Sequence, residues 1–352
     1  MNNLFDMTLK VEHSDIGFDM NLAVKKDNET ISTPATAKVY IPSAAVEEVQ
    51  NELLEYLNKV NTKYLQNTFN TKNEYNELYS IMLNEDLSYK EDIEAAKKQR
   101  QQTYDIITTK PYWKHWQHSY KASNCHTPRL HMSGIGWYQL GRSVRKELFE
   151  GFYQGDLKSS QMAIAATLLD IPDLISFFKN KSDLWAFLAS ETGLERKHIK
   201  ANAKPILYGI LFGMGTDKRI KRAKELNIEK ILEVDLIKQI IAKRDAQYKT
   251  IKDNAVAGIY TDVLGQEHKI TKEYAPHQIL ANVFQSIEFL ILGKAITTEK
   301  LYKEVNLQCW LHDGFICKNK EYMENVKYFV EKTALNLLKN KPIYITLDIE
   351  EI

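Results

Sequence analysis

Two aspartates occupy matching positions far apart in the chain. Asp313 lies in QCWLHDGFICK (308–318), between two short apolar runs, and Asp156 follows FYQG and precedes an apolar helix. Such runs around a glycine-containing turn are typical of a β-hairpin, and a carboxylate at the tip of a buried hairpin is unfavourable unless a cation meets it. Carboxylates are the ligands that Mg²⁺ prefers, and paired ions can bind both the attacking and the leaving oxygen of a phosphoryl transfer. The pair predicts a divalent-metal site, with turn capping as the alternative.

Lysines and aromatic residues recur at every fourth position of one predicted helix. The residues are Lys200, Lys204, Tyr208 and Phe212. Because a four-residue step turns a helix by about 400°, these side chains share one face. Two ammonium groups followed by two rings suit a nucleoside triphosphate, since lysine binds phosphate as a point charge and a ring packs against base and sugar. An ordinary amphipathic helix is the alternative.

Charge is distributed unevenly, although the net charge is only +1. Residues 1–100 carry 11 Lys/Arg and 17 Asp/Glu, a net of −6, whereas residues 101–352 carry 36 and 29, a net of +7. Residues 196–224 hold nine basic residues and one acidic residue, which indicates either a phosphate-binding patch or a solvated helix face. The segment KPYWKHWQHSYK (110–121) interleaves aromatics with Lys and His, as nucleic-acid-binding surfaces do, but such aromatics also close small cores.

Composition excludes several classes of protein. Three cysteines are too few for a disulfide framework or a Cys-rich zinc site. The N-terminus has no basic region followed by an apolar stretch, so no secretory signal is predicted. No apolar run is expected to be long enough to span a bilayer. The sequence therefore predicts a cytoplasmic protein without a membrane partner.

The elements that must hold these residues follow from hydrophobic periodicity and turn signals. They are short strands within 5–41, helices over 45–108, a helix from Ser159 to about Pro172, helices over 183–250, a hairpin at 258–270, a helix at 276–303, the Asp313 hairpin, a helix at 321–339 and a final strand at 342–352. Pro205 lies inside the helix that carries the lysines and aromatics. Because proline removes an amide donor, we expect a kink or a restart of the helix there.

Six segments, in order, resemble motifs of the A-family DNA polymerases and, more distantly, of the single-subunit phage-type RNA polymerases. They are FNTKNEYNELYSIML (69–83), TPRLHMSG…GRSVRKELF (127–149), GDLKSSQMAIAA (155–166), KANAKPILYGILFGMG (200–215), HQILANVFQSIE (277–288) and LHDGFICK (311–318). The small size and the Lys/Asn/Ile-rich composition are similar to the small, exonuclease-less A-family polymerases of mobile elements such as staphylococcal cassettes.

This resemblance implies an α+β fold, the right-hand polymerase fold, with an antiparallel palm sheet, helical fingers and a reduced thumb. The implied division is an N-terminal or thumb region at 1–125, palm at 126–184, fingers at 185–275 and a second part of the palm at 276–352. No proofreading nuclease domain is expected before residue 125. The implied function is template-directed DNA polymerisation, in replication of a mobile element.

The resemblance also assigns roles to individual residues and partners. It implies two Mg²⁺ ions held by Asp156 and Asp313, with Lys204 completing the catalytic set at the triphosphate. The implied substrate-binding residues are Lys200, Tyr208, Phe212, Gln161, Arg129 (near the primer terminus), Gln285 (reaching the minor groove) and His312. The implied partners are a DNA template and primer, dNTPs, and a small single-strand-binding or accessory protein that adds grip to an acidic, shortened thumb.

Four positions depart from the family pattern. Gly314 and Gln161 stand where Glu is usual, Lys200 replaces an Arg, and Phe212 replaces a Tyr. The two lost glutamates leave open a primase or RNA-polymerase-like enzyme that starts chains de novo with a partner protein. An inactive nucleic-acid-binding scaffold is a further alternative, against which the retained aspartates argue. Because Gln is nearly isosteric with Glu, we expect Gln161 to keep a steric block against a 2′-hydroxyl.

Overall fold

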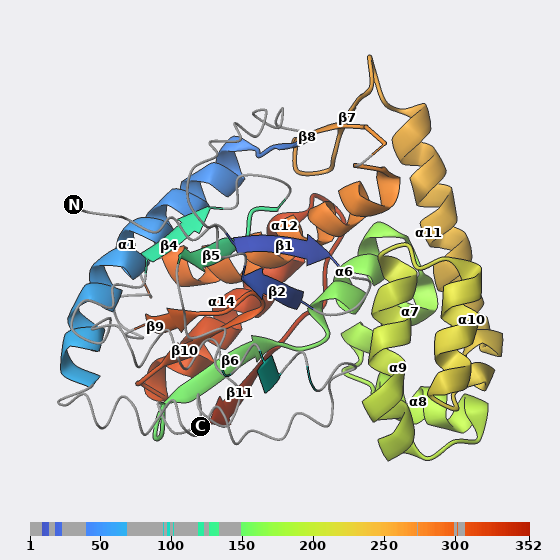
Figure 1. The fold of residues 1–352 in the computed structure, drawn as a ribbon, viewed down its shortest axis with the longest axis horizontal. Helices are drawn as coiled ribbons and strands as arrows, with labels where there is room; N and C mark the ends of the chain where they lie inside the picture. Colours follow the sequence, from blue (N-terminus) through green and yellow to red (C-terminus); the bar gives the residue numbers. More distant parts are fainter. Residues whose placement is uncertain are drawn as a thin grey trace.

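The computed structural model combines helices and antiparallel sheets (Figure 1). It describes residues 9–13, 18–22, 40–68, 94, 97–98, 101, 119–122, 127–133, 149–272, 274–298, 301 and 307–352. A group of helices occupies one side of the molecule, and the largest sheet and a long N-terminal helix occupy the other. The mixed character agrees with the predicted α+β class.

The largest sheet brings together segments from the middle and the end of the chain. Its strands are β6 (Tyr153–Leu157), β9 (Leu307–Trp310), β10 (Gly314–Cys317) and β11 (Leu347–Glu351), in the antiparallel order β11-β6-β10-β9. Gly155 approaches Phe315, Leu347 and Met323 of α14 (Glu321–Leu337), so one face of the sheet packs on that helix. Because side chains alternate along a strand, Gln154 and Asp156 lie on the opposite face.

The helix α12 (Pro276–Thr297) runs through the core and contacts α14, α6 and α1. It is long and apolar enough to cross a membrane by length and composition, so the expectation that no run reaches that length was wrong. Its residues are mostly buried inside the protein, which is typical of a core helix. Gly293 lets α1 approach closely, since an added Cβ there would lie 2.5 Å from Cγ1 of Val49.

The described residues of the N-terminal half include short strands and a long helix. They are β1 (Leu9–His13), β2 (Phe18–Leu22), β3 (Tyr40–Ile41), α1 (Ala44–Thr68), β4 (Ser119–Ala122) and β5 (Leu130–Ser133). The short strands expected within 5–41 are therefore present, and α1 confirms the first part of the helical region. The segment 69–83 lies outside the described residues, so its similarity to a thumb motif stays a prediction.

The helical side of the molecule is built from consecutive elements. They are α6 (Ser160–Leu168), α7 (Pro172–Lys179), α8 (Leu184–Thr192), α9 (Arg196–Leu211), α10 (Thr216–Glu225), the 3₁₀ helix η2 (Glu229–Glu233) and α11 (Asp235–Asp253). Pro172 begins α7 at its first position, where a missing amide donor costs nothing. The helix α9 continues through Pro205, so the expected restart was wrong. Ala201, whose carbonyl loses its partner to Pro205, is exposed, and water can replace that hydrogen bond.

The hairpin expected at 258–270 consists of β7 (Ile259–Thr261) and β8 (Glu267–Lys269), and β3 extends it to three strands. A buried polar network holds it together. Asp262 accepts from Nε2 of Gln266 at 2.8 Å and pairs with Nε2 of His268 at 2.9 Å. Gln266 in turn accepts from the hydroxyl of Tyr40 at 2.6 Å, which ties the N-terminal strand to the hairpin.

Tyr120, the last aromatic residue of the 110–121 segment, supports the hairpin that carries Asp313. Its hydroxyl accepts from the amide of Trp310 at 2.9 Å and donates to the carbonyl of Trp310 at 3.2 Å. Since β9 is the edge strand, these bonds satisfy backbone groups that no neighbouring strand reaches. Tyr120 is buried, which fits the core interpretation of this aromatic; residues 110–118 lie outside the described residues.

We expect Tyr120→Phe to lower the free energy of unfolding by about 1–3 kcal/mol, because it leaves a buried backbone amide without a partner. Urea denaturation measures the change. Tyr328→Phe is the matched control, since Tyr328 is 60% exposed. Equal effects of the two substitutions would contradict the assigned role of Tyr120.

Candidate active site

The sheet brings Asp156 and Asp313 to the same edge. Gly314, the residue after Asp313, is the cross-strand partner of Asp156, and the amide of Leu157 donates to the carbonyl of Asp313 at 2.8 Å. Asp156 and Asp313 therefore occupy neighbouring positions in the sheet, although they are far apart in sequence. This placement is the one that the matching strand-end settings predict.

Gly314 is required by the close approach of the other aspartate. A Cβ added at Gly314 would lie closer than 3.0 Å to Oδ1 of Asp156 and to the carbonyl of Gly155. The carboxylate of Asp156 thus lies over the glycine, and Nε2 of Gln154 donates to its Oδ2 at 2.6 Å. A side chain at position 314 has no room beside this carboxylate. This includes the Glu that is usual here in the family that the sequence resembles.

Asp313 is exposed, although the strand that follows it is buried. The expectation of a buried carboxylate at the hairpin tip was therefore wrong: the hairpin is buried along its strands and open at its turn. The opening leaves the carboxylate of Asp313 accessible to a ligand from solvent.

Two carboxylates suit a hard cation that keeps part of its water or takes phosphate oxygens as further ligands. Within the described ranges, no group of three or more His, Cys, Asp or Glu side chains is arranged to hold a metal ion. Asp156 and Asp313 therefore fit Mg²⁺ as a pair of ligands that a bound substrate completes, and not as a closed protein cage.

The predicted stripe on α9 forms a continuous row of contacts. Nζ of Lys204 lies 5.4 Å from the ring centroid of Tyr208, whose ring meets that of Phe212 edge-on at 6.1 Å. Phe212, the C-cap of α9, lies 6.5 Å from Phe284 of α12. The row thus runs from the exposed Lys204 to the core helix α12.

Tyr208 faces the segments that carry the other candidate residues. Burial raises the pKa of Tyr208, and the negative charges of Glu288 and Asp313 raise it further, while Arg129 acts in the opposite direction. Tyr208 of α9 therefore lies near enough to Glu288, Asp313 and Arg129 for their charges to act on its hydroxyl. The hydroxyl of Tyr208 consequently remains protonated and can donate a hydrogen bond.

His312 and His131 lie together beside Asp313. Their ring centroids are 5.7 Å apart in an edge-on arrangement. Burial, the positive charge of Arg129 and the neighbouring His131 hold the pKa of His312 well below its ordinary value. Neutral imidazole therefore precedes Asp313 at neutral pH.

Glu288 is a site residue that sequence reasoning missed. It is 1% exposed, and it accepts from Nη2 of Arg129 at 2.9 Å and from the hydroxyl of Ser160. Burial raises the pKa of Glu288, whereas Arg129 lowers it. The sequence does contain a signal for Glu288, because it is the only acidic residue in the apolar helix Pro276–Thr297.

For the remaining predicted residues, Gln161, Gln285 and Lys200, the structure gives burial and helix positions. Gln161 is 4% exposed, and both atoms of its amide lack a hydrogen-bond partner among the residues that the structure describes. Gln285 lies three residues before Glu288, on the same side of α12, and is half-buried. Lys200 is exposed one turn before Lys204 on α9. No described contact brings Lys200 or Gln285 to the aspartates.

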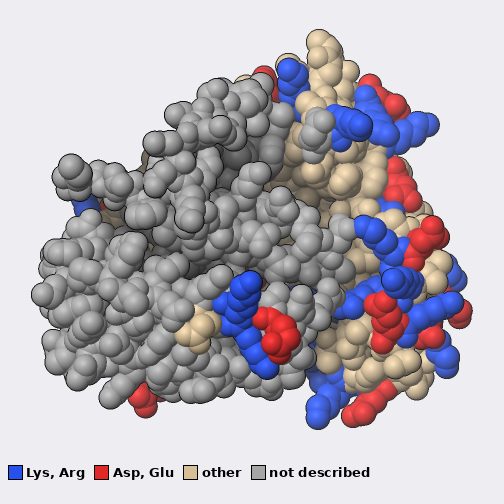
Figure 2. Space-filling model, in the orientation of Figure 1, with Lys and Arg blue, Asp and Glu red and all other residues tan. Residues whose placement is uncertain are grey.

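The basic segment 196–224 divides by residue type. Its arginines bond to protein groups: Arg196 pairs with Asp183, Arg222 with Glu225, and the buried Arg219 donates to the hydroxyl of Thr216. Its lysines are exposed, at positions 197, 200, 204, 218, 221 and 224. Figure 2 shows basic and acidic side chains intermingled on the helical side of the molecule. The exposed lysines fit a solvated helix face, and phosphate binding by this segment stays a prediction.

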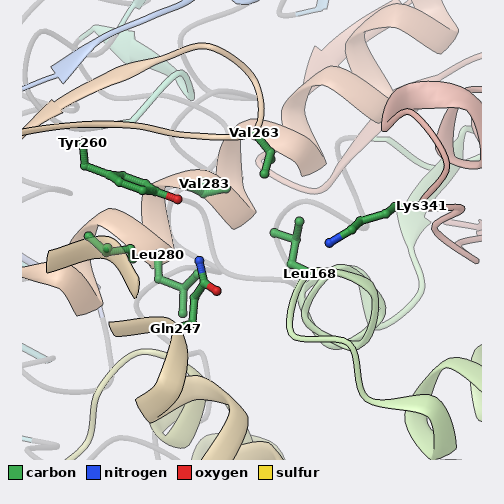
Figure 3. A pocket seen from close by; sticks show the side chains of 8 residues that line it. Leu168, Gln247, Tyr260, Val263, Leu280, Val283 and Lys341 are labelled. Carbon is green, nitrogen blue, oxygen red and sulfur yellow. The ribbon is translucent and has the colours of Figure 1, made fainter. Parts of the chain in front are cut away.

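A pocket between α6, α11, α12 and the β7–β8 hairpin lies apart from this site. Leucine, isoleucine and valine side chains line it, together with Gln247, Tyr260 and Lys341 (Figure 3). None of the predicted site residues belongs to its lining. The candidate active site is instead an open arrangement around the sheet edge and α9.

The comparisons with known proteins support the fold. The sequence matches no protein-family model. No curated protein sequence matches it either. Among solved structures, the fold is similar to that of the POL domain of Pol1 from M. smegmatis in a complex with DNA primer-template and dNTP, with a TM-score of 0.50 and 14% identity over 90% of this chain and 67% of that chain. At this identity the likeness shows the fold alone, which is a polymerase-like fold of mixed helix and sheet.

Proposed function

We propose that this protein is a template-directed DNA polymerase of the A-family type, which adds dNTPs to a primer 3′ end. The observation that carries the proposal is the meeting of Asp156 and Asp313 at one sheet edge, with Tyr208 of α9 near enough for the charge of Asp313 to raise its pKa. The similar fold of a polymerase domain solved with DNA primer-template and dNTP supports it. The resemblance to small polymerases of mobile elements favours a role in replicating such an element.

In this proposal, Asp156 and Asp313 would hold two Mg²⁺ ions, which when bound would supply charge neutralisation at the α-phosphate and activation of the primer 3′-hydroxyl. The chain itself positions the reactants. Gln154 and the close approach of Gly314 fix the carboxylate of Asp156, while the open turn keeps Asp313 accessible. The 3′-hydroxyl gives up its proton to solvent as its oxygen bonds to the α-phosphorus, and the bond from this phosphorus to the bridging oxygen breaks, so that pyrophosphate leaves.

The α9 row binds the incoming nucleotide. Lys204 is exposed and attracts the triphosphate, with Lys200 one turn away as a helper. The ring of Tyr208 packs against sugar and base, and its hydroxyl, whose pKa is raised by burial, stays protonated and can donate a hydrogen bond. Neutral His312 can touch the primer end without adding charge, and Arg129, which directly precedes β5, approaches the primer terminus.

One experiment separates the proposal from a primase or RNA-polymerase-like enzyme and from an inactive scaffold. The purified chain receives primed and unprimed templates, each with either dNTPs or rNTPs. We expect extension of primed templates with dNTPs. Products from unprimed templates with rNTPs would favour the primase, and binding of DNA without any product would favour the scaffold.

Sugar selection is expected to be relaxed. Gln161 is buried without a hydrogen-bond partner in the described part of the chain, and Phe212 has no hydroxyl to hold its amide. One missing hydrogen bond is worth about 1 kcal/mol. Exclusion of ribonucleotides should therefore be roughly fivefold weaker than in a polymerase whose residue at this position is held by such a bond. Single-nucleotide incorporation with matched deoxy, ribo and dideoxy triphosphates measures this.

Two substitutions test the assignment. Phe212→Tyr should sharpen ribose exclusion, and Tyr208→Phe should weaken use of dideoxynucleotides, whose missing 3′-hydroxyl the tyrosine replaces. An outright preference of the unsubstituted protein for ribonucleotides would contradict the steric role of Gln161.

A further inference from the structure

A buried carboxylate connects the segments that carry the two aspartates. Glu288 has a hydrogen bond on each oxygen: Oε2 accepts from Nη2 of Arg129 at 2.9 Å, and Oε1 accepts from the hydroxyl of Ser160. Ser160 is the first residue of α6 and follows Asp156 by four positions. On this side, Glu288 therefore ties α12 to the turn that leads out of strand β6.

On its other side, Glu288 reaches the segment of Asp313 through Arg129. Two residues after Arg129, the ring of His131 meets the ring of His312, which directly precedes Asp313. A chain of contacts consequently runs from one aspartate segment to the other, with Glu288 in the middle.

The orientation of the Arg129 side chain depends on its hydrogen bond with Glu288. This side chain is 15% exposed, and in the described part of the protein the buried Nε has no hydrogen-bond partner. Among the residues that the structure describes, the side chain of Arg129 donates a hydrogen bond to Glu288. Because a guanidinium is planar, a fixed bond at Nη2 restricts the orientation of the whole group. Without the carboxylate of Glu288, the buried positive charge of Arg129 would have no opposite charge beside it, and the guanidinium would have to move.

We propose that Glu288 is a positioning residue for nucleotidyl transfer, which acts by holding Arg129 in place at the primer terminus. The inference rests on the proposed function and adds to it a residue that works through another side chain. Ser160 supports the same task by fixing the second oxygen of the carboxylate.

The test is a double-mutant cycle on primer extension with the full chain. Glu288→Gln keeps the shape of the side chain and removes its charge. We expect it to slow single-turnover insertion by about 10–100-fold, the usual cost of losing an outer partner of a site residue. The KM for dNTP should stay within about threefold, because ground-state binding of the nucleotide is not touched.

The combined variant gives the decisive comparison. Arg129→Ala with Glu288→Gln should be no slower than Arg129→Ala alone, since Glu288 acts through Arg129. Ser160→Ala removes one bond and serves as a milder variant that should slow insertion less, in the same direction. Ser286→Ala is the matched control in α12, because Ser286 is buried and bonds to Asn282. Urea denaturation of every variant shows that it is folded.

The outcomes separate the inference from the proposed function. If the unsubstituted chain extends primers and the two slowing effects multiply in the combined variant, Glu288 is only a structural partner and the positioning role is wrong. If Glu288→Gln inserts at the unsubstituted rate, the role is also wrong. If the unsubstituted chain extends no primer, the proposed function fails and the positioning role with it, although the coupling of Arg129 and Glu288 in stability would still be measurable.

Discussion

Replacing Asp313 or Asp156 with Asn should abolish primer extension while DNA binding stays nearly intact. Each change removes a carboxylate charge at the sheet edge without altering the exposed lysines of α9 and α10. Metal assistance supplies several kcal/mol of transition-state stabilisation, which corresponds to a loss of about a thousandfold in rate. Single-turnover extension measures the loss, and a DNA-binding titration shows that the substrate is still held.

The sheet supplies a matched control for these substitutions. Asp348 of β11 is the cross-strand partner of Asp156, is exposed, and pairs at 3.8 Å with Lys158. Asp348→Asn therefore removes an equal charge beside the same strand and should leave extension nearly unchanged. Near-normal extension by Asp156→Asn or Asp313→Asn would contradict the assignment of the metal ligands.

Gly314→Ala should be almost as damaging, although it alters no charged group. The new Cβ would overlap with Oδ1 of Asp156, so the carboxylate must move. A displacement of about 1 Å at a reacting centre can cost roughly a hundredfold in rate. We expect a loss of that size, with overpacking lowering the free energy of unfolding by about 1–3 kcal/mol.

Gly215→Ala provides the comparison for this substitution. Gly215 has a φ of −63°, and a Cβ added there meets nothing within 4 Å. As the N-cap of α10 it should lose less than about 1 kcal/mol of stability and little activity. If Gly314→Ala extends primers as fast as Gly215→Ala, the carboxylate of Asp156 does not need the position that the structure gives it.

Local pattern was sufficient for the elements that hold the candidate site. The apolar runs beside Asp313 predicted β9 and β10, and the four-residue spacing predicted that Lys204, Tyr208 and Phe212 share one side of α9. Both patterns depend on strand or helix period alone, which neighbouring residues determine. The pairing of Asp156 with Gly314 then follows once the two segments are recognised as strands of one sheet.

Other features depend on tertiary packing, which periodicity does not encode. The exposure of Asp313 arises because the turn extends beyond the buried strands. The role of Glu288 depends on Arg129 and Ser160, which are distant in sequence and meet it in the fold. Pro205 remains inside a continuous helix because packing of α9 outweighs the loss of one hydrogen bond.

We propose that template-directed nucleotide addition takes place at Asp156 and Asp313. The most direct measurement is single-nucleotide incorporation by the purified chain with Mg²⁺, on four primer–templates that differ only in the templating base. We predict that each template directs addition of the complementary dNTP and that Asp313→Asn abolishes all four reactions. Addition that ignores the templating base, or no addition by the unsubstituted protein on any template, would contradict it.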